Sequence, residues 1–306
     1  MKKLLKKVIP LWLVLAIVLD TSLLVGLGEY YLLTRQFNSA LSKLSQTTKN
    51  PEEFIQILKQ EVVPYKGYKT LVKWNDLGKQ LVESGAIDKQ KFEELFAQDV
   101  NVKDHLKYLE GNSNHNMVIN ENNSRFMVNT LWALGLVNKS KVLDEGLMKQ
   151  EGLEVARLAS TGGWTLGTKG PMELYSSQEI IKLTSEQQDL VKKIAENVYR
   201  PCCGNSTAFP DCNHGMAALG YIQLAVKAGL SEKQIYQDLL AFNSYWFPQH
   251  YVEMAAMFSK QNVKWKDVDP KIALSQEYSS ALAASRIQQQ VQDIPGFESK
   301  GGSCGA

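Results

Sequence analysis

Residues 184–248 read TSEQQDLVKKIAENVYRPCCGNSTAFPDCNHGMAALGYIQLAVKAGLSEKQIYQDLLAFNSYWFP. Two stretches, Ser185–Gln188 and Ser231–Gln234, have the Ser-x-x-Gln pattern of a helix capping box. Apolar residues with helical spacing form three successive stripes. The stripes are Val191, Ile194 and Val198; then Gly215, Leu219, Ile222 and Val226; then Ile235, Leu239, Phe242 and Trp246. Because Gly229 and Pro248 interrupt the helices, the stretch predicts a three-helix unit with a cysteine-rich loop between its first two helices.

The rest of the chain also favours helices, so the predicted fold class is mainly α. Residues 31–62 and 124–136 have amphipathic helical spacing, and residues 76–98 predict two short helices. Residues 110–123 are rich in Asn, Gly and Ser, which is typical of a loop. Residues 161–175 hold four glycines and one proline, and we interpret them as an ordered loop or a short hairpin.

These patterns divide the chain into five parts. Residues 1–30 are a membrane anchor or signal segment, and residues 31–160 a helical subdomain of unknown role. Residues 161–183 form a glycine-rich junction, and residues 184–294 a helical domain that carries the thiols. Residues 295–306 form a flexible tail that contains a cysteine.

The N-terminus predicts a membrane helix. Four lysines lie within the first seven residues, and residues 8–28 are apolar apart from a short polar interruption that includes Asp20. Twenty-one residues suffice for a helix to cross a hydrocarbon core of about 30 Å. The lysines should stay in the cytoplasm, which places the bulk of the chain outside it. The alternative is a cleaved signal peptide and a secreted protein, because the run at residues 8–19 matches a signal core.

Composition excludes some classes of function. Apolar residues make up 44% and charged residues 22% of the chain, as in ordinary globular proteins, and the net charge is only +2. Because no basic stripe is present, we expect no nucleic-acid partner. The chain also lacks the P-loop, the dinucleotide-binding glycine motif and the Gly-x-Ser-x-Gly elbow.

Three of the four cysteines lie within eleven residues, at Cys202, Cys203 and Cys212. Asp211 is a suitable N-cap for the second helix, which would make Cys212 its first residue. The unpaired N–H groups of a helix start favour a thiolate, and Arg200 would add to this effect whereas Asp211 would oppose it. We therefore expect chemistry centred on sulfur.

Three interpretations of this cluster remain open. The first is a structural disulfide from Cys212 to Cys202 or Cys203, which an oxidising compartment favours. The second is thiol–disulfide exchange, with Cys212 as the attacking thiolate and Cys202 or Cys203 as the resolving thiol. The third is a site for Zn²⁺ or Cu(I) with Cys202, Cys203, Cys212 and His214 as ligands. Alternatively, His214 is only a solvated or hydrogen-bonded residue of the helix.

The fourth cysteine, Cys304, lies between glycines near the C-terminus. Glycine-rich segments are flexible, so this thiol sits on a predicted mobile arm. Such an arm suits a resolving thiol or a thiol that delivers metal. The alternative is an exposed tail whose cysteine pairs with another molecule or with nothing.

Residues 186–248 resemble the CcmH-type thiol proteins of cytochrome c maturation. That family has an Arg-Cys-x-x-Cys loop and an Asp-x-Asn that enters the next helix. Alignment on Arg200 places Asp211 and Asn213 on the Asp-x-Asn. However, Pro201 and Gly204 occupy the positions of the family cysteines, Cys202 and Cys203 lie between them, and Cys212 lies inside the Asp-x-Asn. The resemblance implies a membrane anchor and thiol reduction outside the cytoplasm.

The sequence thus predicts a protein anchored in the membrane through residues 8–28, with its thiols outside the cytoplasm. Its first predicted role is to bind a soft metal or to present thiols to a partner protein. The first alternative is a thiol–disulfide oxidoreductase related to cytochrome c maturation. The second is an interaction domain held by a disulfide, whose function lies in residues 31–180.

Overall fold

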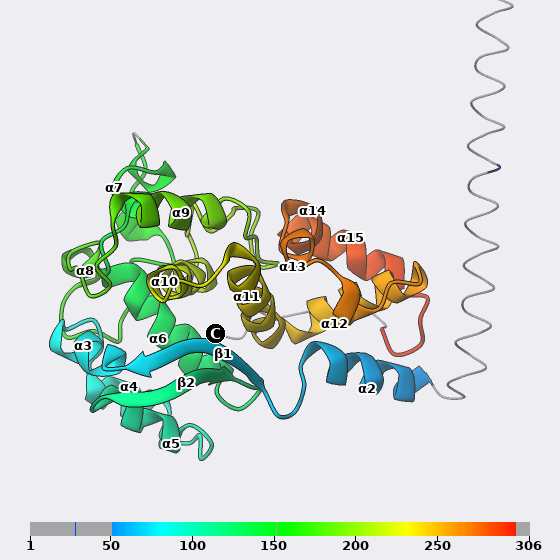
Figure 1. Cartoon of the computed structure of the whole chain (residues 1–306), viewed down its shortest axis with the longest axis horizontal. Coiled ribbons are helices and arrows are strands. Elements are labelled where there is room, and N and C mark those ends of the chain that lie inside the picture. The colour runs from blue at the N-terminus through cyan, green and yellow to red at the C-terminus, as the bar shows by residue number, and fades with distance from the viewer. Residues whose placement is uncertain (1–27, 29–50, 151, 298–306) are drawn as a thin grey trace, which may run out of the picture.

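The computed structural model describes residue 28 and residues 51–150 and 152–297, and the fold is mainly helical (Figure 1). The first half contains α2 (Pro51–Val62), β1 (Tyr68–Asn75), α3 (Leu77–Glu83), α4 (Lys89–Leu95), α5 (Lys103–Leu106), β2 (Ser113–Ile119), α6 (Ser124–Val137), α7 (Lys141–Asp144) and α8 (Pro171–Leu174). The second half contains α9 (Ser185–Ala195), α10 (Asn213–Lys227), α11 (Glu232–Trp246), α12 (Pro248–Lys260), α13 (Pro270–Ala273), α14 (Gln276–Ser279) and α15 (Ala281–Val291). Four short 3₁₀ turns lie at Lys107–Leu109, Leu147–Lys149, Val155–Arg157 and Trp265–Asp267.

Most predicted helices are confirmed. Helices α3 and α4 match the two short helices expected over residues 76–98, and α6 matches the one expected from residue 124. Helices α9, α10 and α11 form the predicted three-helix unit, with Ser231 capping α11 through its bond to the Gln234 N–H. The cap of α9 differs from the prediction by one residue, because Thr184 rather than Ser185 accepts the capping bond from Gln187.

The predicted loop over residues 110–123 is wrong in part. Residues 113–119 form β2, which pairs antiparallel with β1. Partners such as Tyr68 and Ile119 define the register, which shifts twice along the ladder. Every second residue of β1 from Thr70 onwards is buried, whereas the first half of β2 is polar and mostly outside the core. The pairing with β1 therefore makes these residues a strand, and the polar composition of β2 hid it.

Helices α6 and α10 pack against each other and cross (Figure 1). They approach so closely that a Cβ atom on Gly135 would lie 2.0 Å from the carbonyl oxygen of Met216. A Cβ on Gly220 would lie 2.3 Å from the carbonyl oxygen of Leu131. Two glycines therefore allow backbone contact where larger side chains would separate the helices. This contact fixes the start of α10, where Cys212 lies, against the core.

The glycine-rich segment 161–175 is packed into the core. Trp164 is buried and its indole Nε1 donates to the carbonyl oxygen of Ala86 at 2.9 Å. The indole of Trp132 donates to the carbonyl oxygen of Ser160 at 2.6 Å. The segment contains α8 and no strand, so it is a loop with one short helix. One hydrophobic cluster joins residues on both sides of it, from Leu58 to Phe297. The division into subdomains at this junction stays a prediction.

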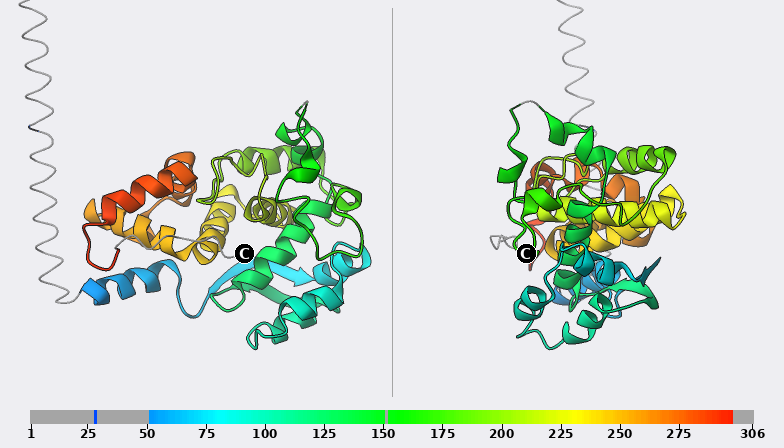
Figure 2. Two further views of the ribbon diagram at one scale, coloured as in Figure 1. Left: turned by 180° about the vertical axis from the view of Figure 1, so that it is seen from behind. Right: turned by 90° about the vertical axis from the view of Figure 1, so that its left-hand side faces the viewer.

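Helix α2 packs along α12 at the end of the molecule that also carries α15 (Figures 1 and 2). The predicted membrane segment at residues 8–28 lies outside the described residues, apart from Gly28, and so do the first part of the predicted helix over 31–62 and Cys304. Within residues 51–150 and 152–297, no helix has the length and apolarity that crossing a bilayer requires.

Candidate metal centre

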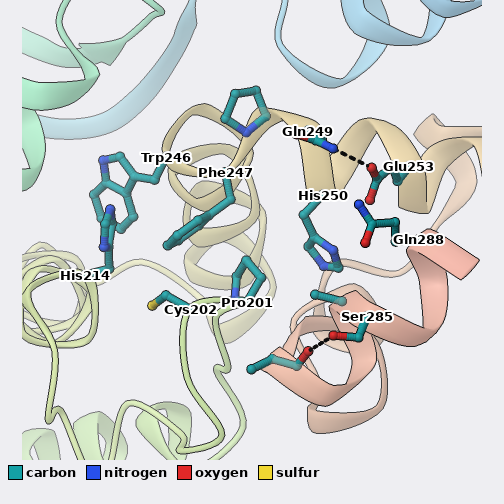
Figure 3. A pocket seen from close by; sticks show the side chains of 13 residues that line it. Pro201, Cys202, His214, Trp246, Phe247, Gln249, His250, Glu253, Ser285 and Gln288 are labelled. Carbon is teal, nitrogen blue, oxygen red and sulfur yellow. Dashed lines mark hydrogen bonds between the residues drawn. The ribbon is translucent and has the colours of Figure 1, made fainter. Parts of the chain in front are cut away.

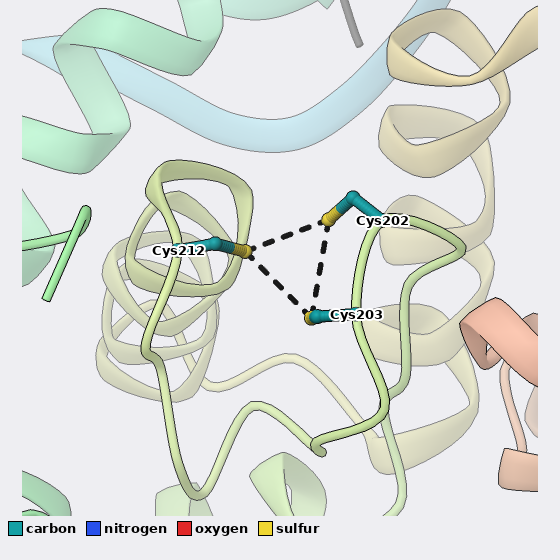
Figure 4. Close-up of side chains that lie close together, drawn as sticks. All are labelled: Cys202, Cys203 and Cys212. Carbon is teal, nitrogen blue, oxygen red and sulfur yellow. Dashed lines mark hydrogen bonds between the residues drawn. The ribbon is translucent and has the colours of Figure 1, made fainter. Parts of the chain in front are cut away.

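The loop between α9 and α10 brings three sulfur atoms together (Figure 4). The Sγ atom of Cys202 lies 3.5 Å from that of Cys212 and 3.9 Å from that of Cys203. The Sγ atoms of Cys203 and Cys212 are 3.8 Å apart. All three residues are partly buried free cysteines. The prediction that the cysteines around the start of α10 converge is therefore confirmed.

The size of this triangle decides between two kinds of sulfur chemistry. A disulfide requires a separation of about 2.05 Å, so the predicted bridge from Cys212 to Cys202 or Cys203 is not formed. A tetrahedral Zn²⁺ with bonds of about 2.3 Å requires sulfur atoms about 3.8 Å apart. The three observed distances average about 3.7 Å. The sulfurs thus have the spacing of three ligands on one ion.

Cys212 is the N-cap of α10, which corrects the prediction that Asp211 caps this helix. The Sγ of Cys212 accepts a hydrogen bond from the Gly215 N–H at 3.4 Å, and Asn213 is the first helical residue. The Asp211 carboxylate is engaged elsewhere: it accepts from Arg200 at 2.7 Å and from the Asn205 amide at 2.8 Å. A capping contact directs the sulfur of Cys212 towards the positive end of the helix.

The Arg200 guanidinium holds the cysteine loop together from inside. Its side chain is only 1% exposed. It donates to the Sγ of Cys212 at 3.0 Å, to the carboxylate of Asp211, and to the carbonyl oxygens of Asn205 at 3.0 Å and Phe209 at 3.3 Å. A buried cation is tolerated because each of its three nitrogen atoms donates to at least one acceptor. Arg200 therefore fixes both the shape and the charge of the site.

Gly215 leaves the space that this guanidinium occupies. A Cβ atom at position 215 would lie 2.5 Å from Cζ of Arg200, closer than real contacts allow. The helix can thus present its first turn directly to the guanidinium. The sequence offered Gly215 only as part of an apolar stripe, so this function of the residue was not predicted.

The three thiols differ in pKa. Hydrogen bonds from Cys202 and Cys203, helped by the charge of Arg200, hold the pKa of Cys212 well below its ordinary value despite burial. Donation to the other two sulfurs raises the pKa of Cys202. The bond from Cys202 lowers the pKa of Cys203, but donation to Cys212 and burial outweigh it and raise that pKa to about 12. Of the three thiols, Cys212 is thus the one whose thiolate form the site favours, and binding a cation would release the protons of the coordinating thiols.

His214 lies outside the group of three sulfurs. Its ring is 4% exposed and packs against Phe247, with centroids 4.4 Å apart, and against Trp246 at 5.6 Å. Burial lowers the pKa of His214 to about 4, so the ring is neutral. Among the described residues the structure brings together only the three cysteines of the four predicted ligands.

The remaining residues predicted for the site lie next to the three cysteines and are not among the metal ligands. Asn213 begins α10, and its side-chain oxygen accepts from the His214 N–H at 2.9 Å. Arg200 and Asp211 form the ion pair described above. Asn205, for which the sequence predicted no role, completes this network through its side chain and its carbonyl group. A long-range pairing of this kind leaves no periodic signal in the sequence.

A pocket of about 490 Å³ opens beside the cysteine loop (Figure 3). Cys202 and Pro201 line one side, and His250 and Glu253 of α12 line the opposite side. Phe247 also lines the pocket. One of the three sulfur-bearing residues thus borders a cavity that a further ligand can enter.

Comparison of the chain with family models, curated proteins and solved structures gives no match, so the CcmH-type resemblance stays a prediction.

Proposed function

We propose that this protein binds one soft metal ion, Zn²⁺ or Cu(I), through Cys202, Cys203 and Cys212. The observation that carries the proposal is the triangle of free sulfurs with edges of 3.5, 3.8 and 3.9 Å. Thiolates are soft ligands that select Zn²⁺ and Cu(I) over hard cations such as Mg²⁺ and Ca²⁺. Among the described residues no carboxylate belongs to the group, which fits the same preference.

The charges around the site support this proposal. Three thiolates and a divalent ion carry a net charge of −1, and the buried Arg200 lies 3.0 Å from the nearest sulfur. Its positive charge offsets the excess negative charge where water is excluded. The bonds from Arg200 to Asn205 and Phe209 also hold the loop in one shape before metal arrives, which reduces the conformational entropy lost on binding.

We further propose that the site faces the outside of the cytoplasm, on a chain held in the membrane by residues 8–28. The support is the lysine-rich start followed by an apolar run of 21 residues. Oxidising compartments convert neighbouring thiols into disulfides. A bound ion would protect the three sulfurs from that reaction. The role that follows is to hold a metal, or to present the thiols to a partner protein.

Metal analysis of the chain purified under reducing conditions tests this proposal. After incubation with Zn²⁺ or Cu(I) and removal of excess metal, we expect one ion per chain. Cys202→Ser, Cys203→Ser and Cys212→Ser should each weaken binding by more than the roughly 10- to 100-fold that loss of an outer-shell partner costs. Ser206→Ala, in the same loop, is the matched control and should bind as the natural chain does. A natural chain that retains neither ion would overturn the proposal.

Thiol–disulfide exchange is the second candidate function. It is favoured by Arg200, 3.0 Å from the sulfur of Cys212, with the sulfur of Cys202 a further 3.5 Å away. The Cys212 thiolate would attack a disulfide of a partner protein and release one partner thiolate. Cys202 would then attack the sulfur of Cys212 and release the second. The partner gains two electrons, the site becomes a disulfide, and a second thiol protein must reduce it again.

Alkylation of the metal-free chain at neutral pH tests the redox candidate. It predicts that Cys212 reacts faster than free cysteine, as a stabilised and accessible thiolate should. Mass mapping identifies which cysteine is modified. Reaction of all three loop cysteines at or below the rate of free cysteine would contradict the redox function, whatever the outcome of the metal analysis.

A further inference from the structure

We propose that the pocket of about 490 Å³ beside Cys202 binds a small aminothiol, whose sulfur takes the fourth position on the metal and whose ammonium group lies between Glu253 and His250. This inference rests on the proposed function, because the ligand completes the coordination of the same ion. It names the class of compound that the site would hold: a molecule with a thiol at one end, an amine at the other and a short carbon spacer between them.

The three cysteines leave one position of a tetrahedral ion open. Zn²⁺ sites with three protein ligands keep the fourth position for water or for a ligand from outside the protein. Within residues 51–150 and 152–297, no further Cys, His, Asp or Glu joins Cys202, Cys203 and Cys212. Cys202 borders the pocket, whereas Arg200 lies against the sulfur of Cys212. We therefore expect a ligand to approach the ion from the pocket, and a soft ion favours sulfur as the donor.

The opposite wall of the pocket carries a buried carboxylate without a cation beside it. Glu253 is 4% exposed, and it accepts a hydrogen bond from the Gln249 amide at 2.9 Å. No lysine or arginine is among the described residues that line the pocket. Buried charges in proteins are normally paired with an opposite charge. An ammonium group on the ligand would supply the partner that this carboxylate lacks.

His250 offers a second acceptor on the same wall. Its ring is 7% exposed, and Nε2 donates to the carbonyl oxygen of Tyr278, which leaves Nδ1 as an acceptor. This Nδ1 atom is buried and has no hydrogen-bond partner in the described part of the chain. His250 and Glu253 are three residues apart on α12, so they share one face of the helix (Figure 3). Since an ammonium group has three N–H donors, it can donate to both side chains at once.

The size of the pocket matches an aminothiol with a two-carbon spacer. Cys202 and Phe247 face Glu253 and His250 across the pocket (Figure 3), and a sphere of 490 Å³ has a diameter of about 10 Å. Two sulfurs on one tetrahedral ion are about 3.8 Å apart. An extended chain of sulfur, two carbons and nitrogen covers about 4 Å, with bonds of about 1.5 Å. A charged hydrogen bond to the carboxylate adds about 2.8 Å. These lengths together span about 10–11 Å, which is close to the width of the pocket.

Coordination of the ligand balances without an oxidant. The thiol of the aminothiol loses its proton to solvent as its sulfur bonds the metal, and it displaces the water that would otherwise hold the fourth position. The metal keeps its oxidation state. The ammonium group keeps its charge and pairs with the carboxylate of Glu253.

Absorption titration of the Co²⁺-loaded full chain tests the inference, because Co²⁺ occupies Zn²⁺ sites and its sulfur-to-metal absorption grows with the number of bound thiolates. Cysteamine, added without oxygen and with no other thiol present, should raise this absorption by about a third as three thiolates become four. Glu253→Gln should weaken cysteamine binding about 10- to 100-fold, as loss of a hydrogen bond between charged groups does, and should leave binding of 2-mercaptoethanol unchanged. Glu196→Gln, which removes an exposed carboxylate at the end of α9, is the matched control and should change neither.

A second comparison needs no variant, so it holds even if Glu253→Gln does not fold. With the natural chain, 2-mercaptoethanol has a hydroxyl group where cysteamine has its amine. At equal concentrations of thiolate it should bind about 10- to 100-fold more weakly.

Three outcomes would overturn the inference. The first is a Co²⁺-loaded chain whose absorption cysteamine leaves unchanged. The second is loss of the ion from the chain to cysteamine, measured as the metal content after gel filtration. The third is equal binding of cysteamine and 2-mercaptoethanol at equal thiolate concentration, which would mean that Glu253 does not hold the amine. Failure of the natural chain to bind Co²⁺ before any thiol is added would instead refute the proposed function itself.

Discussion

Arg200 connects several parts of the cysteine loop through one buried side chain. Its guanidinium joins the sulfur of Cys212, the carboxylate of Asp211 and two loop carbonyl groups while remaining 1% exposed. Arg200→Met would fill similar space but remove the positive charge and the four hydrogen bonds that these acceptors receive from the guanidinium. Breaking a buried ion pair in this way costs about 3–5 kcal/mol. We expect the free energy of unfolding, measured with urea, to fall by that amount.

The matched control is Lys192→Met, which removes a positive charge from an exposed position of α9. Surface substitutions of this kind change stability by no more than about 0.5 kcal/mol. Equal effects of the two substitutions would show that Arg200 has no special structural role.

Gly215 gives a second test at the residue scale. Gly215→Ala would place a Cβ atom 2.5 Å from Cζ of Arg200, so either the guanidinium or the helix must move. Overpacking of this kind costs about 1–3 kcal/mol, although alanine is the better helix former. Gly204→Ala is the control, because a Cβ there meets no atom within 4 Å. Thermal unfolding of both variants checks the difference, and a Gly215→Ala chain as stable as the control would contradict the described packing.

Individual residues show how much of the site the sequence predicts. Cysteine spacing predicted the three-sulfur cluster, because loops between helices bring nearby residues together. The sequence placed the cap on Asp211, one residue too early, because that carboxylate pairs with Arg200 eleven residues before it. The sequence left His214 open as a ligand or as an ordinary residue of the helix, and in the structure its ring packs on Phe247 outside the group of three sulfurs. Such choices depend on three-dimensional neighbours, which spacing alone does not specify.

The crossing of α6 and α10 is the main element-scale support of the site. Gly135 and Gly220 allow the two backbones to touch along the first half of α10, at Met216 and Gly220. Gly135→Ala would put a Cβ atom 2.0 Å from the carbonyl oxygen of Met216, in a core that cannot relax freely. We expect a loss of about 3 kcal/mol in the free energy of unfolding, at the upper end for overpacking.

Gly111→Ala controls for this substitution, since a Cβ there has no atom within 4 Å. Chemical unfolding should leave that variant close to the natural chain. If both alanine variants unfold at the same denaturant concentration, the backbones of α6 and α10 do not touch at Gly135.

Elements were predictable where a local signal exists. Helical stripes and caps located α9, α10 and α11 because both are set by neighbours within four residues. Strand β2 has no such signal, since its first half is polar and its partner β1 lies almost forty residues earlier. Pairing over that distance decides its structure, so composition alone favoured a loop.

At the scale of the whole molecule, a buried histidine couples stability to pH. The ring Nε2 of His250 donates to the carbonyl oxygen of Tyr278 at 2.9 Å, and burial lowers the pKa of His250 from 6.5 to about 4. Between these values the unfolded chain holds a proton on this ring that the folded chain does not. The free energy of unfolding should therefore fall as the pH falls from 6.5 to 4, by about 1.4 kcal/mol per pH unit for this group.

His250→Gln keeps a donor near Tyr278 and removes the titration. In the metal-free state we expect the free energy of unfolding of the variant to fall less steeply between pH 6.5 and 4, by about 1.4 kcal/mol per pH unit. Above pH 6.5 the variant and the natural chain should show the same dependence on pH. Urea unfolding at a series of pH values measures both curves. Parallel curves over the acidic range would mean that the ring titrates normally in the folded chain.

X-ray absorption at the metal edge of the loaded full chain tests whether Cys202, Cys203 and Cys212 hold one metal ion together. We expect a first shell of three or four sulfur atoms at about 2.3 Å from the metal. Serine in place of any one of the three cysteines should remove one sulfur from that shell. A first shell made only of nitrogen and oxygen atoms would show that these cysteines do not bind the ion.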